Sequence, residues 1–310
     1  MQITSWANKR VLITGSGGFI GSHLLTYFKK RNAKVLGVIR AKKISNQEVS
    51  IDLTDKEKVY YVVHTFRPDA VFHLASEALV ETGQLHPYET FHNNIVSTLN
   101  ILETSRILRV PRIIIASTVH VYGRAPMPYT EDEPARPSRP YETSKTAADL
   151  IAQSYADNYD LPVLIPRFVN IYGPGDVNLA RIIPKTIRSV VHNEQPALWG
   201  GGAKRDYLYI DDALRAYDLL GKISDRQIDR NRIYNFATGK PVTAKKLMEM
   251  IISLSDTPNS VKRVTEGRPH ELDRQEVNWS KAKRLLGWRP EVELAEGLTR
   301  TLQWFRQHRS

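Results

Sequence analysis

Apolar and polar residues follow two recurring patterns along the first half of the chain. Short runs of consecutive apolar, mostly β-branched residues predict buried strands, and stretches with apolar residues three or four positions apart predict helices. We expect strands at residues 9–15, 34–39, 70–74, 112–117 and 163–166, alternating with helices at residues 21–31, 55–66, 91–108 and 141–159. Apolar strands that alternate with helices are typical of a parallel sheet covered on both faces. The pattern therefore predicts an α/β fold.

The pattern changes after about residue 170, where glycine and proline cluster and the alternation becomes less regular. The clusters are YGPG at residues 172–175 and LWGGG at residues 198–202. We expect residues 1–170 to form the main domain. Residues 171–310 are expected to form mostly a smaller C-terminal α/β lobe, with some of its segments returning to the main sheet.

The composition excludes several classes of protein. The chain has 310 residues, enough to bury a large core, and no cysteine. The lack of cysteine excludes a disulfide scaffold, a thiolate zinc site, an iron–sulfur cluster and a cysteine nucleophile; we expect a cytoplasmic protein without a metal site. No run approaches the roughly 18 apolar residues that span a bilayer, and the first ten residues lack the apolar core of a secretory signal. We therefore expect no membrane association.

The positive charge of the chain is concentrated in one segment. The net charge is +11, and residues 29–43 contain seven Lys and Arg residues and no acidic residue. Such a surplus is compatible with nucleic acid, an acidic membrane or small anionic ligands. Because the segment lacks the interleaved aromatic residues of a nucleic-acid platform, we expect small phosphorylated ligands and no nucleic acid.

A glycine pattern directly follows the first predicted strand. Residues 14–21 read TGSGGFIG, with glycine at positions 15, 18 and 21. Glycine permits a tight turn and lets backbone amides approach a pyrophosphate, and the N-terminus of a helix favours an anion. The placement predicts a Rossmann-type doubly wound sheet that binds a dinucleotide. The residues expected to hold it are Gly15, Gly18, Phe19, Ile20 and Gly21. The alternative is a merely flexible turn.

The end of the second predicted strand indicates which dinucleotide binds. An acidic residue usually holds the adenosine ribose there and selects NAD, whereas this strand ends in Arg40, with Lys43 just beyond. A guanidinium can bind a 2′-phosphate with two parallel hydrogen bonds. We therefore favour NADP(H) over NAD(H), the alternative being that Arg40 points into solvent. Asp52 and Leu53 are expected to contact the adenine edge.

A tyrosine and a lysine four residues apart suggest catalytic chemistry. Tyr141 and Lys145 fall on one face of a predicted helix. A lysine near the phenol, together with an oxidised nicotinamide, is expected to lower the pKa of the tyrosine from about 10 toward neutrality. Such a tyrosine can remove a hydroxyl proton or protonate an alkoxide. Thr118, at the end of the preceding strand, can hydrogen-bond the reacting oxygen.

Seven segments in the same order give the chain a strong resemblance to a known superfamily. They are TGSGGFIGSHL at 14–24, FHLAS at 72–76, NNIVSTLNILE at 93–103, ASTVHVYG at 116–123, YETSK at 141–145, PRFVNIYGPGD at 166–176 and RDYLYIDDA at 205–213. The chain resembles the extended short-chain dehydrogenase/reductases, in the branch of nucleotide-sugar epimerases, dehydratases and reductases.

The resemblance implies roles for individual residues. Thr118, Tyr141 and Lys145 would be the catalytic triad, and residues 171–310 would mainly bind a nucleoside-diphosphate sugar. The resemblance adds Leu74, Ala75, Asn94 and Val169 as cofactor contacts, beside Tyr141 and Lys145. It adds Glu77, Asn170, Arg205 and Arg268 as substrate contacts, beside Thr118. Arg205 and Arg268 would bind the diphosphate, or they would be solvated or bridge the lobes. Relatives also suggest a homodimer formed through the helices at 91–108 and 141–159.

The residues after Thr118 leave the reaction open. Dehydratases of the glucose type place Asp-Glu there, whereas this chain has Val119 and His120. His120 is a candidate catalytic acid or base, the alternative being a packed or sugar-binding histidine, and Glu77 and Glu142 are weaker candidates. We rank a 4-epimerase or a 4-keto-sugar reductase first. A 4,6-dehydratase of the CDP-glucose or GDP-mannose type, or a 3,5-epimerising member, would need His120 or another group as the extra acid or base and is second. A non-catalytic dinucleotide-binding regulator is third.

Overall fold

The main domain is built around one parallel sheet. The computed structural model describes residues 3–40, 47–199, 202–224, 228, 232–255, 262–264 and 274–308. The strands of the sheet lie in the order β12-β7-β5-β4-β1-β2-β3, and β6 also pairs with β7. Their bounds are β1 Arg10–Thr14, β2 Lys34–Ile39, β3 Glu48–Ser50, β4 Ala70–His73, β5 Ile113–Ile115, β6 Ser117–Thr118, β7 Val163–Phe168 and β12 Ile233–Phe236. The order reverses direction at β1, which confirms the doubly wound α/β fold.

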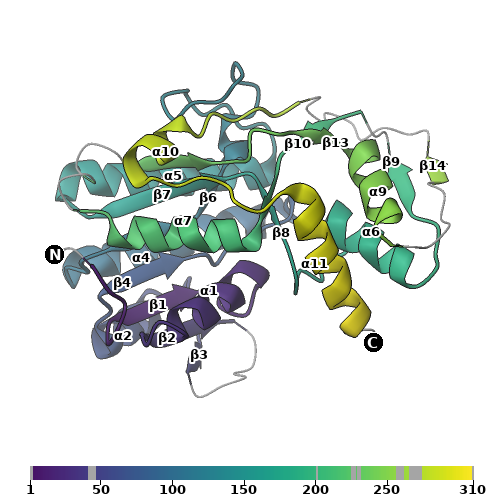
Figure 1. Ribbon diagram of the computed structural model, residues 1–310. Helices are drawn as coiled ribbons and strands as arrows, with labels where there is room; N and C mark the ends of the chain where they lie inside the picture. The colour runs from purple at the N-terminus through teal and green to yellow at the C-terminus, as the bar shows by residue number, and fades with distance from the viewer. Residues whose placement is uncertain are drawn as a thin grey trace.

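Helices cover both faces of this sheet (Figure 1). Successive side chains of β1 point to opposite faces of the sheet: Val11 and Ile13 enter one apolar core, and Leu12 enters the other. The first core includes residues of α1 (Phe19–Lys29) and α7 (Ile210–Lys222). The second core includes residues of α2 (Lys56–Phe66), α4 (Pro87–Ile107) and α5 (Pro140–Tyr159). Strand β1 is therefore buried on both sides.

The C-terminal half contributes both to the sheet and to a smaller lobe. From this half, β12 pairs with β7 and α7 packs on the first core, so these two segments belong to the main domain. The lobe lies to one side in Figure 1 and contains three two-stranded pairs and several helices. Its elements are β8 Asn170–Tyr172, α6 Ile182–Val191, β9 Ala197–Trp199, β10 Lys204–Arg205, β11 Tyr207–Tyr209, β13 Val242–Thr243, α9 Ala244–Ser253, β14 Lys262–Val264 and α11 Leu294–Gln307. Helix α10 (Ser280–Leu286) packs against β12 and so also belongs to the main domain (Figure 1).

The predicted helices of the first half are present, with shifted ends. Helix α4 begins at Pro87 rather than at residue 91. Proline is favoured in the first turn of a helix, because N–H groups there have no acceptor within the helix and the N–H that proline lacks is not needed. The connections add the short helix α3 (Val80–Leu85) and the single turn η1 (Val119–Tyr122). Within the described ranges, no helix is both long enough and apolar enough to cross a bilayer.

Candidate active site

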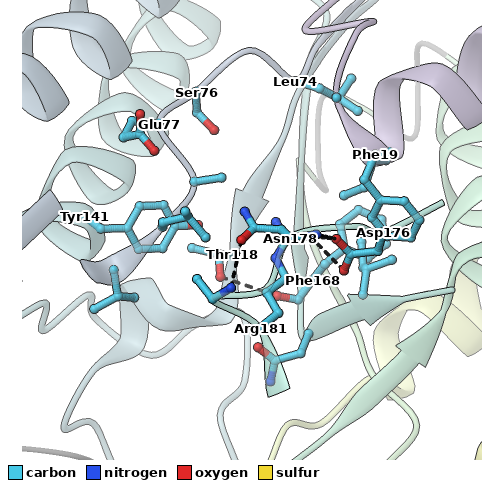
Figure 2. Close-up of a pocket in the computed structure, with 18 of the residues that line it drawn as sticks. Phe19, Leu74, Ser76, Glu77, Thr118, Tyr141, Phe168, Asp176, Asn178 and Arg181 are labelled. Carbon is cyan, nitrogen blue, oxygen red and sulfur yellow. Dashed lines mark hydrogen bonds and ion pairs between the residues drawn. The ribbon is translucent and has the colours of Figure 1, made fainter. Parts of the chain in front are cut away.

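A cleft of about 980 Å³ runs along the carboxyl ends of the main strands and the adjoining surface of the lobe. Parallel α/β sheets bind their ligands at this edge. Figure 2 shows side chains from both parts of the molecule converging on it. Most of the predicted site residues line the cleft, namely Gly15, Gly18, Phe19, Ile20, Gly21, Arg40, Asp52, Leu53, Leu74, Ala75, Glu77, Thr118, His120, Tyr141, Lys145, Val169, Asn170 and Arg205.

The glycine turn forms a cradle that only glycine fits. Gly15 has φ +70°, and a Cβ there would lie 2.8 Å from the amide nitrogen of Ala75. A Cβ on Gly21 would overlap the carbonyl of Gly15. The first intrahelical bond of α1 runs from Ser22 N–H to the Gly18 carbonyl, so the amides of residues 19–21 come before it. Such amides at a helix N-terminus suit a pyrophosphate, so this turn fits a dinucleotide.

A buried histidine that the sequence analysis did not single out joins this turn to the neighbouring strand. His73 Nδ1 lies 2.8 Å from Thr14 Oγ1, and its Nε2 lies 3.1 Å from Thr98 Oγ1. The amides of Leu74 and Ala75 both donate to Thr14 Oγ1, at 3.2 Å. Because burial excludes the charged imidazole, the pKa of His73 is lowered to about 3.

The end of β2 carries a cation and a carboxylate. Arg40 follows this strand, and both Arg40 and Asp52 line the cleft. Asp52 accepts hydrogen bonds from the amide and hydroxyl of Thr54, both at 2.9 Å. These bonds, with a smaller contribution from the charge of Arg40, hold the pKa of Asp52 below its usual value. The predicted partner Lys43 lies outside the described residues.

The catalytic candidates Thr118, Tyr141 and Lys145 all line the cleft. Lys145 Nζ donates to the Ala116 carbonyl at 2.6 Å, and burial lowers the pKa of this ammonium to about 8. Burial raises the pKa of Tyr141 to about 12 in the chain alone. The opposing influences are the charge of Arg181 and a hydrogen bond with Thr118. The phenol is therefore protonated at neutral pH. The lowering expected with an oxidised nicotinamide beside the phenol stays a prediction.

Arg181 is a site residue that the sequence analysis missed. Its Nη1 donates to both carboxylate oxygens of Asp176, at 3.0 and 3.1 Å. In Figure 2 the side chain rises between Asp176 and the side of the cleft that carries Thr118 and Tyr141. Burial raises the pKa of Asp176, and Arg181 opposes that shift. No motif marks Arg181, since only the folded loop after β8 brings it to Tyr141.

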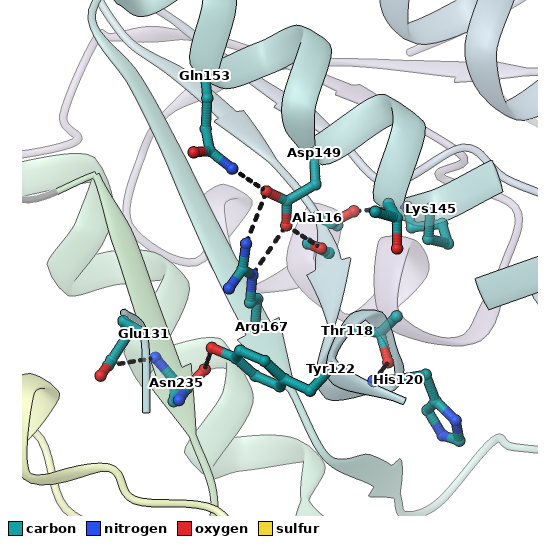
Figure 3. Close-up of polar contacts among 12 residues, drawn as sticks. Ala116, Thr118, His120, Tyr122, Glu131, Lys145, Asp149, Gln153, Arg167 and Asn235 are labelled. Carbon is teal, nitrogen blue, oxygen red and sulfur yellow. Dashed lines mark hydrogen bonds and ion pairs between the residues drawn. The ribbon is translucent and has the colours of Figure 1, made fainter. Parts of the chain in front are cut away.

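A buried ion pair lies behind the lysine (Figure 3). Arg167 donates from Nε and Nη2 to the two carboxylate oxygens of Asp149, both at 2.9 Å. Ser117 Oγ donates to the same carboxylate at 2.6 Å. Asp149 stands one helical turn after Lys145, and its charge opposes the fall in the pKa of Lys145. The pair therefore joins α5, β6 and β7 directly below the catalytic candidates.

His120 lies in the cleft beside a buried carboxylate. Its Nδ1 is 3.7 Å from Glu142 Oε1, and its ring meets that of Tyr141 edge to face with centroids 6.3 Å apart. Glu142 Oε2 accepts from Ser138 N, Ser138 Oγ and Arg139 N at 3.1 to 3.2 Å. Burial raises the pKa of Glu142, but His120 and the Ser138 amide outweigh burial, so the pKa is lowered overall.

The remaining predicted contacts differ in position. Asn94 does not line the cleft but lies one layer behind it, where its side chain accepts from Glu77 N and donates to Glu77 O and Ser144 Oγ. Both ends of its amide hold the Glu77 backbone, and a direct cofactor contact by Asn94 stays a prediction. Asn170 donates to the Asp206 carbonyl at 3.2 Å. Arg268 lies outside the described residues.

No cluster of potential metal ligands occurs in the part of the chain that the structure describes.

Comparison with known proteins places this geometry in context. A family model described as the NAD dependent epimerase/dehydratase family matches residues 11–237. The chain is 29% identical to human dTDP-D-glucose 4,6-dehydratase, with 97% of this chain and 91% of the human protein covered. It is 30% identical to UDP-glucuronate 4-epimerase of Thermodesulfobacterium geofontis, with 96% of each covered. The crystal structure of UDP-glucose 4-epimerase from Thermotoga maritima with UDP-glucose matches with a TM-score of 0.87 at 29% identity, covering 96% of this chain and 99% of that one.

Proposed function

Because this chain belongs to the NAD dependent epimerase/dehydratase family, we propose that it transfers hydride at C4 of a nucleoside-diphosphate sugar, with Thr118, Tyr141 and Lys145 as the catalytic residues. The chain is an enzyme of the extended short-chain dehydrogenase/reductase type, and its cofactor is a nicotinamide dinucleotide. The observation that supports the proposal most strongly is the shared cleft, which the glycine cradle and the three candidate side chains all line.

Each of the three residues has a distinct chemical task. The phenol of Tyr141 exchanges a proton with the oxygen on C4, and the Thr118 hydroxyl orients that oxygen by a hydrogen bond. The charge of Lys145 stabilises the phenolate form. The bound dinucleotide supplies the hydride acceptor or donor. Because burial keeps the phenol protonated, Tyr141 can donate its proton to a ketone oxygen, which is the step that reduction requires.

The candidate reactions differ in whether they need a catalytic group besides the triad. A 4-epimerase or a 4-keto-sugar reductase needs only Thr118, Tyr141 and Lys145, and we rank these reactions first. A 4,6-dehydratase needs a further acid or base, and His120 in the cleft supports that second candidate. Relatives of both kinds match over nearly the whole chain, as the human dehydratase and the bacterial 4-epimerase show.

The deciding experiment is incubation with a panel of nucleoside-diphosphate sugars and their 4-keto derivatives, with and without NADPH, followed by mass spectrometry. A new isomer of unchanged mass indicates epimerisation, a gain of two hydrogens indicates reduction, and a loss of water indicates dehydration. Tyr141→Phe should abolish each of these reactions and leave dinucleotide affinity nearly unchanged, whereas Tyr159→Phe, at an exposed position on the same helix, should remain active. Turnover by Tyr141→Phe would contradict the catalytic assignment.

We also propose the finer preferences that the sequence suggests. Arg40 at the end of β2 supports NADP(H), and the sugar diphosphate would meet Asn170, Arg205 and Arg268. Exposed apolar side chains on α4 and α5, including Tyr88, Leu99, Leu150 and Tyr159, support a homodimer through these helices. Light scattering at several concentrations tests the homodimer. A cytoplasmic location stays a prediction from the absence of cysteine.

A further inference from the structure

We propose that Glu142 and His120 form a proton-transfer pair, in which Glu142 is a positioning residue and His120 exchanges a proton at the sugar carbon next to a C4 ketone. The inference rests on the proposed function, because it assumes that a 4-keto sugar occupies this cleft. It adds a second chemical step to hydride transfer and names the residue that orients the histidine.

The two oxygens of Glu142 have separate partners. Oε2 accepts from Ser138 N, Ser138 Oγ and Arg139 N, which fixes the carboxylate at the start of α5. Oε1 faces His120 Nδ1 at 3.7 Å, within ion-pair range and somewhat longer than a hydrogen bond. Catalytic hydrogen bonds are often long in ligand-free structures and shorten when substrate binds. One oxygen is therefore used for the helix cap and the other is directed at the imidazole.

The positioning residue Glu142 is buried, whereas His120 is open to the cleft, as a proton-transfer pair requires. The side chain of Glu142 is only 6% exposed, so its charge acts on His120 with little screening, whereas that of His120 is 22% exposed and lines the cleft. The carboxylate favours the tautomer with hydrogen on Nδ1, which leaves the lone pair of Nε2 free to accept a proton. The Tyr141 ring lies edge to face with His120 and is a second titratable group close to it.

The chemistry balances without a further reagent. In a 4-keto sugar, the C–H bond next to the carbonyl breaks, its electron pair enters the carbonyl to form an enolate, and the proton moves to His120 Nε2. The Tyr141 phenol, which is protonated at neutral pH, and the Thr118 hydroxyl can hydrogen-bond the enolate oxygen. The imidazolium then returns a proton from solvent to the same carbon. The oxidant that makes the ketone is the nicotinamide dinucleotide of the proposed function, or the ketone is supplied directly.

The chain provides a closely matched control for the capping role of Glu142. The tetrapeptide Pro-Tyr-Glu-Thr begins both α4 and α5, so Glu89 stands at the same position in its helix as Glu142 does in α5. Glu89 is exposed and does not line the cleft. Glu89→Gln therefore reports what the loss of a first-turn carboxylate does to the helix alone.

The test measures exchange and hydride transfer separately. The full chain, saturated with oxidised dinucleotide, is incubated in deuterated buffer with 4-keto-6-deoxy sugars carrying uridine, thymidine, cytidine or guanosine diphosphate. NMR then follows loss of the hydrogen at C5 or C3. Hydride transfer is followed in a second assay by nicotinamide absorbance, with NADPH and the same sugars. Exchange without hydride transfer would count against the proposed function alone, and hydride transfer without exchange would count against the pair alone.

We expect the parent protein to exchange at least one of these sugars well above the rate without enzyme. Glu142→Gln, which keeps one carbonyl oxygen to accept the cap hydrogen bonds but removes the charge, should lower exchange by roughly 10- to 100-fold with little change in KM. His120→Ala should lower exchange by roughly 100-fold or more, and both variants should lose much less hydride transfer than exchange. Glu89→Gln should match the parent in both assays. Exchange that is absent in the parent, or undiminished in either variant, would overturn the pair, as would an equal loss in the two assays.

Discussion

The hydrogen bonds around His73 define a single arrangement of protons. Thr98 Oγ1 donates to the Asn94 carbonyl at 2.7 Å, so it must accept from His73 Nε2–H. Thr14 Oγ1 accepts from the amides of Leu74 and Ala75, so its own hydrogen goes to His73 Nδ1. Each hydroxyl and ring hydrogen of this network has one acceptor if the imidazole is neutral. A charged imidazole would place a second hydrogen between Nδ1 and Thr14 Oγ1. The cofactor turn after β1 is therefore held to β4 and α4 by an uncharged histidine.

This neutral histidine makes stability sensitive to acid. Between pH 6.5 and about 3 the unfolded chain binds a proton at His73 and the folded chain does not, so stability falls as the pH falls through this window. The expected loss is roughly 1.4 kcal/mol for each pH unit below 6.5. His73→Asn removes this dependence, so the difference between parent and variant in the free energy of unfolding should shrink from pH 7 to pH 5. Urea titrations measure it, with His64→Asn at an exposed position as the control. A difference that stays constant with pH would contradict the account.

Cofactor choice is also a property of single residues. Arg40 lines the cleft where the second strand ends, and a guanidinium there attracts a 2′-phosphate that a carboxylate would repel. Arg40→Asp should shift the ratio of kcat/KM for NADP(H) over NAD(H) toward NAD(H) by about 10-fold or more. Lys30→Asp changes the net charge equally at an exposed position outside the cleft and should leave the ratio unchanged. An unchanged ratio in Arg40→Asp would mean that Arg40 does not contact the phosphate.

At the scale of elements, the buried pair of Asp149 and Arg167 fixes α5 against β7. Removing one partner leaves the other charge buried without compensation, which costs about 3–5 kcal/mol. Asp149→Asn should therefore destabilise the fold by that amount, and it should also lower the pKa of Lys145 further, because Asp149 now raises it. Asp157 pairs with Arg232 on the exposed side of the same helix, so Asp157→Asn should cost less than about 1 kcal/mol. Equal losses in urea unfolding of the two variants would refute this assignment.

Local sequence patterns were sufficient to predict the helices and strands of the first half of the chain. They were insufficient to predict the contacts that connect these elements in the fold. The periodicity at residues 141–159 predicts α5 almost to the residue, because Pro140 and the apolar spacing are both local signals. Tyr141 and Lys145 follow from the same helix. Arg181, His73 and Asp149 could not be assigned in this way, since each acts through a partner that only the folded chain brings near. The ion pair behind Lys145 also depends on β7, which adjoins both β5 and β12 in the sheet.

At the scale of the molecule, the two halves of the chain share one core. Trp6 Nε1 donates to Asp218 Oδ1 at 2.6 Å, and a Cβ on Gly221 would lie 2.5 Å from the Trp6 ring. Phe168 of β7 stacks on Phe236 of β12, with ring centroids 4.9 Å apart. Without the second half, the first half would therefore expose an apolar helix-binding face and the unpaired edge of β7, a site for aggregation.

This sharing predicts one cooperative unfolding transition for the whole chain. Trp6 lies in the first core beneath α7, and Trp288 packs on Phe236 in the same core, so both should leave their environment together. The chain has five tryptophans, so variants that keep only Trp6 or only Trp288, with the other four replaced by phenylalanine, let fluorescence follow one region at a time, with far-UV circular dichroism as the global probe. All midpoints should coincide, and residues 1–170 expressed alone should fail to unfold cooperatively. Two separated midpoints, or a cooperative fragment, would show that the halves are independent domains. In that case the cleft would be a junction between two separately stable units, and the positions of Asp176 and Arg181 relative to Tyr141 would depend on how those units dock.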